Sequence, residues 1–216
     1  MYLSRITWEG SPKEIANWNP YRHHEMVWKF FPLDPKAKRR WMFRYDLDRG
    51  RPRYFLVSLE PPQPVAKWRI ETKPYTPDLC NGDLLHFDLR VNPVVSRREG
   101  KRVKRFDVVM DYKYQLDKEA REKLDQNKLI YRLGCEWLAR RASSHGFEIG
   151  ARRTLVACYR PSVFHKRKHP DPMTVTTMDL TGTLRVTEVD AFRNMLFNGL
   201  GPAKSFGCGL MLVRRA

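Results

Sequence analysis

The stretch GLGPAKSFGCGL, from Gly199 to Leu210, lies between a predicted short helix and the last predicted strand of the chain. Its four glycines permit positive φ angles and a close approach of the backbone to a bulky neighbour. The stretch suggests two kinds of nucleotide-binding loop, but it matches neither of them. Ala203 stands where a Walker loop needs glycine, and Lys204 stands where a dinucleotide fingerprint needs its third glycine. Packing of this loop against its own sheet is the alternative to a ligand-binding role.

Outward from this loop, a strand–helix–strand–strand pattern occurs twice. In the second half, a helix is expected over residues 116–144, with a break near 125–128 and with Gly146 after its end. Strands are expected at 147–149, 154–159, 173–186 and 208–213, with a helix at 189–197. In the first half, strands are expected at 1–8, 41–46, 54–59, 65–70 and 84–91. This order predicts an α+β fold of two tandem ferredoxin-like (RRM-like) domains with antiparallel sheets, over residues 1–112 and 116–216.

Positive charge dominates the composition. The 216 residues include 41 Lys and Arg but only 24 Asp and Glu, which gives a formal net charge of +17. Such a surplus favours nucleic acid or an anionic membrane as partner, although an ordinary basic soluble protein would also fit. The basic residues gather in loop-like blocks rather than along one face of a helix, which argues against a membrane. The blocks lie at 36–40, 96–105, 151–153 and 165–169. Exposed blocks of this kind suit contact with phosphates.

Several function classes are disfavoured by what the sequence lacks. No apolar run approaches the ~20 residues that a membrane span needs, and the N-terminus shows no signal-peptide pattern, so a soluble, intracellular protein is expected. The four cysteines form no CxxC pair, which argues against a zinc ribbon. Asp46 and Asp48 form the only close carboxylate pair in the relevant region, and they make a metal-dependent nuclease a weak alternative.

The stretch NPYRHHEMVWKFFP, Asn19 to Pro32, predicts a helix with Asn19 as its N-cap and Pro20 at its first position. Its adjacent histidines point about 100° apart, so they cannot play the same role. Tyr21 and His24 are three residues apart and share one face. His23 falls instead between Val27 and Phe30, where a structural role is expected.

Several motifs together give a resemblance. The helix, the glycine-rich stretch and the final strand resemble the C-terminal part of the repeat-associated RNA-binding superfamily. In order along the chain, MYLSRI, YRHHEMVWKFFP, DLRVNPV and VTTMDLTGTLRV resemble more narrowly the CasE family of CRISPR endoribonucleases. The resemblance spans essentially the whole chain and implies two ferredoxin-like domains. It further implies metal-free cutting of CRISPR precursor RNA at the base of each repeat hairpin, with retention of the product and no cofactor.

The same resemblance implies partners and site residues. The partners are the repeat hairpin and other subunits of a Cascade-type complex, in a prokaryotic cytoplasm. Tyr21, His24 and Trp28 match the family's Tyr-x-x-His-x-x-x-Trp pattern. His24 is then the proton-transfer residue for attack by the ribose 2′-hydroxyl, and Tyr21 orients the ribose or shares the proton transfer. The family's lysine near the phosphate corresponds to Lys166 or Lys168. The choice stays open, and we assign Lys168 as catalytic.

The remaining candidates bind RNA without acting in the chemistry. They are Lys166, Arg167, Arg152, Arg153, Arg102, Arg105 and, within the glycine-rich loop, Lys204. That loop could also serve domain packing, so the role of Lys204 has two interpretations. A catalytically inactive scaffold that binds an RNA hairpin within a ribonucleoprotein complex is the alternative to an enzyme.

Overall fold

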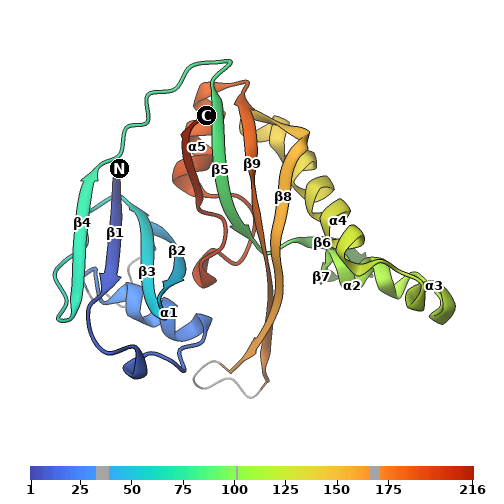
Figure 1. The fold of residues 1–216 in the computed structure, drawn as a ribbon, viewed down its shortest axis with the longest axis horizontal. Helices are drawn as coiled ribbons and strands as arrows, with labels where there is room; N and C mark the ends of the chain where they lie inside the picture. The colour runs from blue at the N-terminus through green and yellow to red at the C-terminus, as the bar shows by residue number, and fades with distance from the viewer. Residues whose placement is uncertain (33–38, 101, 166–170) are drawn as a thin grey trace.

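The structure, a computed structural model, describes residues 1–32, 39–100, 102–165 and 171–216, apart from the side chains of residues 99 and 151–153. It contains two four-stranded antiparallel sheets that lie beside each other (Figure 1). Among the helices described, none is both long enough and apolar enough to cross a membrane. The predicted α+β class with two ferredoxin-like halves is confirmed by the order of the strands.

The first sheet has the order β2-β3-β1-β4. Its first and third strands therefore lie in the centre, as in a ferredoxin-like fold. The helical element η1 precedes the single α-helix of this half, and residues 59–67 join the last two strands without a helix. The bounds are β1 (Tyr2–Trp8), η1 (Pro12–Glu14), α1 (Pro20–Trp28), β2 (Trp41–Asp48), β3 (Arg51–Ser58) and β4 (Trp68–Pro74).

Helix α1 begins where the sequence predicts. The side chain of Asn19 accepts a hydrogen bond from the Arg22 backbone N–H at 3.0 Å, and Pro20 occupies the first helical position, where no N–H is needed. Met26 and Val27 are buried on the face that covers the first sheet. The aromatic side chains of Phe30, Tyr54 and Trp68 complete this core. One face of the helix is thereby fixed against the sheet, and a different face points to the second domain.

The second sheet repeats the same order, β10-β5-β9-β8. Helices α4 and α5 contribute to the core on one face of it. The predicted break in the long helix is confirmed, since α3 ends at Glu122 and α4 begins at Gln126. The bounds are β5 (Leu84–Val91), α3 (Lys118–Glu122), α4 (Gln126–Ala142), η2 (Ser143–His145), β8 (Phe147–Phe164), β9 (Met173–Val186), α5 (Val189–Asn198), η3 (Lys204–Phe206) and β10 (Met211–Arg215).

Strand β5 requires a correction to the predicted domain ranges of 1–112 and 116–216. It was assigned to the first domain, but it pairs with β9 along its whole length and with β10 from Leu85 to Leu89. It is the first strand of the second ferredoxin-like unit, which otherwise would have only three strands. On this pairing we propose that the boundary between the domains lies within residues 75–83.

An insertion separates β5 from α4. It consists of the hairpin of β6 (Val94–Glu99) and β7 (Arg102–Asp107), helix α2 (Val108–Tyr114) and helix α3. The basic block over 96–105 lies on this hairpin, and α2 begins directly after β7, at Val108. The Asp107 side chain ends the strand there, because it caps the backbone N–H groups of Val109 and Met110.

Strands β8 and β9 are much longer than their neighbour β5. The two strands predicted at 147–149 and 154–159 are one strand, with irregular register between Ile149 and Thr154 and between Val156 and Cys158. Strand β5 pairs with β9 only from Met178 to Arg185. Beyond that point, β8 and β9 continue as a two-stranded ribbon that extends toward α1 (Figure 1).

The two domains meet through both apolar and charged contacts. Met42 and Val57 of the first sheet pack against Leu210 of the second domain. Beside them, the Arg44 guanidinium donates to Asp88 at 2.7 Å across the boundary. Arg90 donates to the backbone oxygen of Tyr45 in the first domain at 2.6 Å, while two further nitrogens bind Asp179 at 2.7 and 2.9 Å.

Candidate active site at the domain boundary

Tyr21, His24 and Trp28 share one face of α1, as the sequence predicts. The Trp28 indole N–H donates to His24 Nε2 at 3.2 Å. An indole nitrogen can only donate, so His24 Nε2 is the acceptor. The neutral imidazole therefore carries its proton on Nδ1. Trp28 thus fixes both the tautomer and the orientation of the ring.

The second domain closes over this face. The His24 ring centroid lies 6.4 Å from that of Phe206 in the glycine-rich loop and 5.7 Å from that of Trp41 at the start of β2. Phe206 also packs edge-on against Phe164, the last residue of β8, at 5.2 Å. Tyr21 packs against this same cluster. Side chains distant in the sequence are therefore gathered around Tyr21 and His24.

His23 has the structural role that was expected. Only 4% of it is exposed, its Nδ1 lies 2.9 Å from the hydroxyl oxygen of Tyr54, and its ring stacks on Tyr45 at 3.9 Å. Burial, with a smaller contribution from the nearby charge of Arg90, lowers the pKa of His23 to about 4. At neutral pH this imidazole is an uncharged core residue.

The glycine-rich loop packs between the domains. Gly209 has φ +92°, and its N–H donates to the backbone oxygen of Arg90 at 2.7 Å. A Cβ at this position would lie 2.8 Å from the backbone oxygen of Leu200. At Gly207, with φ +81°, a Cβ would lie 3.1 Å from the Tyr45 ring. These contacts favour the packing interpretation of the loop.

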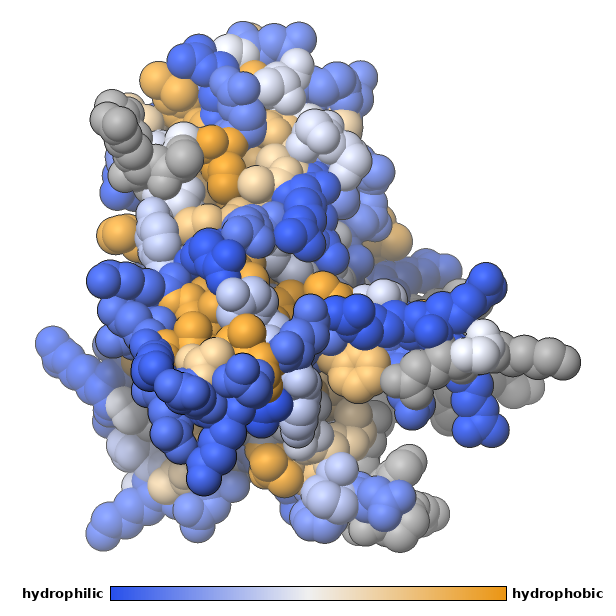
Figure 2. Space-filling model, turned by 90° about the vertical axis from the view of Figure 1, so that its right-hand side faces the viewer, coloured by the Kyte–Doolittle hydropathy of each residue, from blue (hydrophilic) through white to orange (hydrophobic). Residues whose placement is uncertain are grey.

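The predicted RNA-binding residues are distributed over several elements. Arg102 and Arg105 are exposed on β7, in the hairpin that lies apart from α1 (Figure 1). Figure 2 looks onto the side of the molecule that carries the insertion, where hydrophilic side chains predominate around smaller hydrophobic patches. Lys204 is half-buried in η3, next to the domain boundary.

The other predicted residues lie on β8 and in the segment that follows it. Arg152 and Arg153 belong to β8, but their side chains lie outside the description. Lys166, Arg167 and Lys168 lie outside the described residues altogether. Their roles stay predictions.

The carboxylates considered for a metal site are engaged in ion pairs. Asp46 lies 3.2 Å from the Arg44 guanidinium and 3.5 Å from that of Arg90. Asp48 pairs with Arg53 at 3.2 Å. Within the described ranges, no three His, Cys, Asp or Glu side chains gather as a potential metal site.

Three residues near the site were not singled out from the sequence. Arg39 donates to the Ser205 hydroxyl at 2.7 Å, which joins the segment before β2 to the glycine-rich loop. Phe206 and Trp41 form the aromatic surroundings of His24. Arg39 belongs to a basic block and Phe206 to the glycine-rich stretch, so both lay within segments that the sequence marked as unusual.

Fold and site together define a basic protein of two ferredoxin-like domains, with a Tyr–His face enclosed where the domains meet. The family described as "CRISPR associated protein" matches residues 1–215, and the chain belongs to this family. The chain is 28% identical to the Escherichia coli (strain K12) protein "CRISPR system Cascade subunit CasE", over 98% of each sequence.

Two solved structures share the fold over nearly the whole chain. The CRISPR endoribonuclease Cse3 bound to a 19-nucleotide RNA matches with a TM-score of 0.73 at 23% identity, covering 99% of this chain and 100% of the other. Thermus thermophilus Cse3 bound to an RNA that represents a pre-cleavage complex matches with a TM-score of 0.69 at 22% identity, covering 99% and 98%.

Proposed function

We propose that the protein is a metal-independent endoribonuclease that cuts CRISPR precursor RNA within each repeat, at the base of its hairpin. The observation that carries the proposal is the face of α1 on which Tyr21 and His24 lie together, enclosed by Phe206 and Phe164 of the second domain. Family membership and the names of the relatives, a Cascade subunit and RNA-bound endoribonucleases, support the same activity.

The proposed reaction needs no atom beyond the RNA and protons. The ribose 2′-oxygen attacks the adjacent phosphorus, a new bond from the 2′-oxygen to phosphorus forms, and the bond from phosphorus to the 5′-oxygen breaks. The products are a 2′,3′-cyclic phosphate and a 5′-hydroxyl. One proton leaves the 2′-hydroxyl and one is gained by the 5′-oxygen, so the total number of protons is unchanged.

His24 is the residue to which we assign this proton transfer. A neutral imidazole has one basic nitrogen and one N–H, so it can accept one proton and release another. Nε2 accepts the Trp28 N–H, so this hydrogen bond would have to open for Nε2 to take the 2′-hydroxyl proton while Nδ1 gives its own proton to the leaving 5′-oxygen; the imidazole then ends neutral. Tyr21, one turn earlier on the same face, would orient the ribose or share in the transfer.

Positive charge around the phosphate would come from the segment between β8 and β9. Phe164 ends β8 and Met173 begins β9, and both pack in the cluster that contains Tyr21. Lys166 and Lys168 follow Phe164 by two and four positions in the sequence. We propose that one of them, Lys168 by our assignment, supports the scissile phosphate.

The basic blocks would hold the rest of the hairpin. Arg102, Arg105, Arg152, Arg153 and Arg167 suit contacts with phosphates, because side chains reach the base edges of an RNA duplex poorly through its deep, narrow major groove. Retention of the product and assembly with other subunits of a Cascade-type complex are part of the proposal. For the assembly, support comes from the name of the E. coli relative, a Cascade subunit. A prokaryotic cytoplasm is the proposed location.

The test compares His24→Ala with the wild-type protein on a labelled repeat RNA. Loss of general acid–base catalysis should slow cleavage by about 10²–10⁴-fold while hairpin affinity stays within a few-fold. Tyr21→Phe keeps the ring packing and removes the hydroxyl, so it reports on the second role. Undiminished cleavage by His24→Ala would overturn the assignment.

Two controls separate the alternatives. Wild-type protein should cut in EDTA and leave a cyclic phosphate end, whereas a metal-dependent nuclease would stop. A 2′-deoxy substitution at the cut should abolish cleavage, because the attacking oxygen is gone. A wild-type protein that binds the hairpin tightly but never cuts it would be the RNA-binding scaffold instead.

A further inference from the structure

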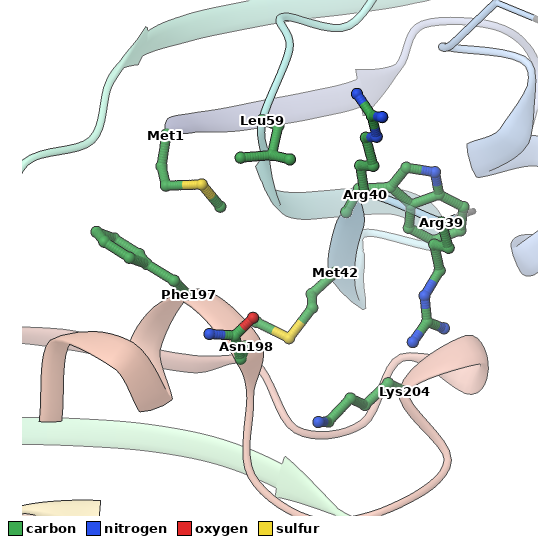
Figure 3. Close-up of a pocket in the computed structure, with 9 residues that line it drawn as sticks. Met1, Arg39, Arg40, Met42, Leu59, Phe197, Asn198 and Lys204 are labelled. Atoms are coloured by element: carbon green, nitrogen blue, oxygen red, sulfur yellow. The ribbon is translucent and has the colours of Figure 1, made fainter. Parts of the chain in front are cut away.

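A pocket of about 480 Å³ lies where the two domains meet (Figure 3). This volume falls within the ~300–1,000 Å³ typical of ligand sites. The first domain contributes the start of β1 and the segment entering β2, and the second contributes the end of α5 and η3. The pocket is lined by Met1, Arg39, Arg40, Trp41, Met42, Leu59, Phe197, Asn198 and Lys204.

One part of the pocket is strongly cationic. Arg39 and Lys204 are half-buried and lie close enough for the charge of Arg39, added to the larger effect of burial, to lower the pKa of Lys204. The hydrogen bond from Arg39 goes to the neutral hydroxyl of Ser205, and Arg40 pairs with Glu60 at 3.6 Å. None of the described residues that line the pocket is an acid.

The charges of Arg39 and Lys204 repel each other, and burial weakens the solvation of both. An anion placed between them would relieve both costs, since opposite charges at short range favour the charged forms. This arrangement is therefore suited to a phosphate.

The other part of the pocket is apolar. The side chains of Met1 and Phe197 face each other there, with Met42 behind them and the amide of Asn198 at the edge (Figure 3). Phe197 is half-buried and packs edge-on against Tyr75 at 5.7 Å, so its ring is held in place. An aromatic and apolar surface of this kind suits a nucleobase, which every nucleotide can present.

Trp41 links the pocket to the candidate active site. Its indole lines the pocket and also lies 5.7 Å, centroid to centroid, from the His24 ring. Trp41 itself is only 5% exposed, so an RNA whose scissile phosphate lies beside His24 would reach the pocket along the adjoining Arg39 and Ser205 rather than over the indole. The hairpin stem itself is a poor occupant, because a base in a duplex is stacked and cannot enter a pocket.

We propose that this pocket binds a single-stranded nucleotide of the RNA that adjoins the cut, with its phosphate between Arg39 and Lys204 and its base against Phe197. The inference rests on the proposed function, since it assigns a further part of the same substrate. It predicts that the protein recognises a hairpin together with a flanking single strand.

The test uses three RNAs made uncleavable by a 2′-deoxy group at the cut: the hairpin alone, and the hairpin with four single-stranded nucleotides on its 5′ or its 3′ side. Affinity is measured by fluorescence anisotropy as salt is varied. One extension should tighten binding by about tenfold, as expected for one stacked base. It should also steepen the plot of log K against log salt by about 0.7 per phosphate contacted.

Matched variants locate the effect. Lys204→Met keeps most of the length and packing of the side chain but removes the charge, and Arg39→Gln replaces the guanidinium by a shorter, uncharged amide. Each should remove about 0.7 of the extra salt slope, while Lys204→Arg should retain it. Lys128→Met removes one charge from an exposed lysine on α4 and should leave the effect of the extension unchanged.

Failure of the inference can be distinguished from failure of the proposed function. If the wild-type protein cuts ordinary repeat RNA but neither extension changes affinity or salt slope, the pocket assignment is wrong and the enzyme assignment stands. An equal loss in Lys128→Met and Lys204→Met would also overturn the pocket, because it would indicate a general charge effect. If the wild-type protein neither binds nor cuts the hairpin, both fail together.

Discussion

Acidification should destabilise this protein through one buried imidazole. His23 is 4% exposed, and its native pKa of about 4 lies well below the ~6.5 of an unfolded histidine. Between these two values the unfolded chain binds a proton that the native protein does not. The free energy of unfolding therefore falls as the pH falls through this window.

The magnitude follows from the same two values. Relative to pH 7, the loss from this group amounts to about 2 kcal/mol at pH 5 and about 3 kcal/mol at pH 4. Urea unfolding at pH 7, 5 and 4, followed by tryptophan fluorescence without RNA, measures the change. Other groups also titrate in this range, so the wild-type protein alone does not isolate His23.

A double variant provides the comparison. His23→Phe with Tyr54→Phe replaces both members of the buried polar pair, so neither hydrogen-bonding group is left without its partner. The variant keeps every other titrating group and should lose about 3 kcal/mol less than the wild type between pH 7 and pH 4. Parallel curves for the two proteins would refute the explanation, since the excess loss would then have another origin.

Two further predictions concern the domain boundary. Gly209→Ala should lower the melting temperature more than Gly82→Ala: both glycines have φ +92°, but a Cβ at Gly82 meets nothing within 4 Å whereas at Gly209 it meets backbone. The shared strain costs about 1–3 kcal/mol, and equal melting temperatures would show that the contact is unimportant. Arg90→Met should destabilise by about 3–5 kcal/mol in urea, because Asp179 loses its partner at a site where both side chains are at most 20% exposed. Arg5→Met, in an exposed pair, is the control and should change little; similar losses in both would contradict the argument.

Local signals in the sequence predicted helix α1 well. The assignment of strands to sheets was predicted less well, because it depends on pairing between residues far apart in the sequence. Asn19 and Pro20 define the start of the helix by interactions within one turn, so no tertiary context is needed. Strand β5 was found but was placed in the wrong domain. The alternation of apolar and polar residues in β5 would suit either sheet. Its partners on β9 and β10 lie about 90 or more residues away in the sequence.

The candidate active site likewise combines a local feature, which the sequence predicted, with a long-range contact, which it did not. The spacing of Tyr21 and His24 on one helical face is a local property, and it was predicted. The approach of Phe206 to His24 depends on how the domains pack, over 180 positions of sequence. Asp46 was considered as half of a metal site because its ion pair with Arg90 is not a local property: Arg90 is far from it in the sequence and adjacent to it in the fold.

The ribbon formed by the outer parts of β8 and β9 determines how far the second domain reaches. A strand advances about 3.4 Å per residue, and side chains alternate between its two sides. Removing two residues from each strand would therefore preserve the facing of every side chain and draw the tip back by about 7 Å. Relatives with shorter or longer ribbons would end at different distances from α1, and strand length alone would then set whether residues such as Phe164 and Met173 reach the face that carries Tyr21.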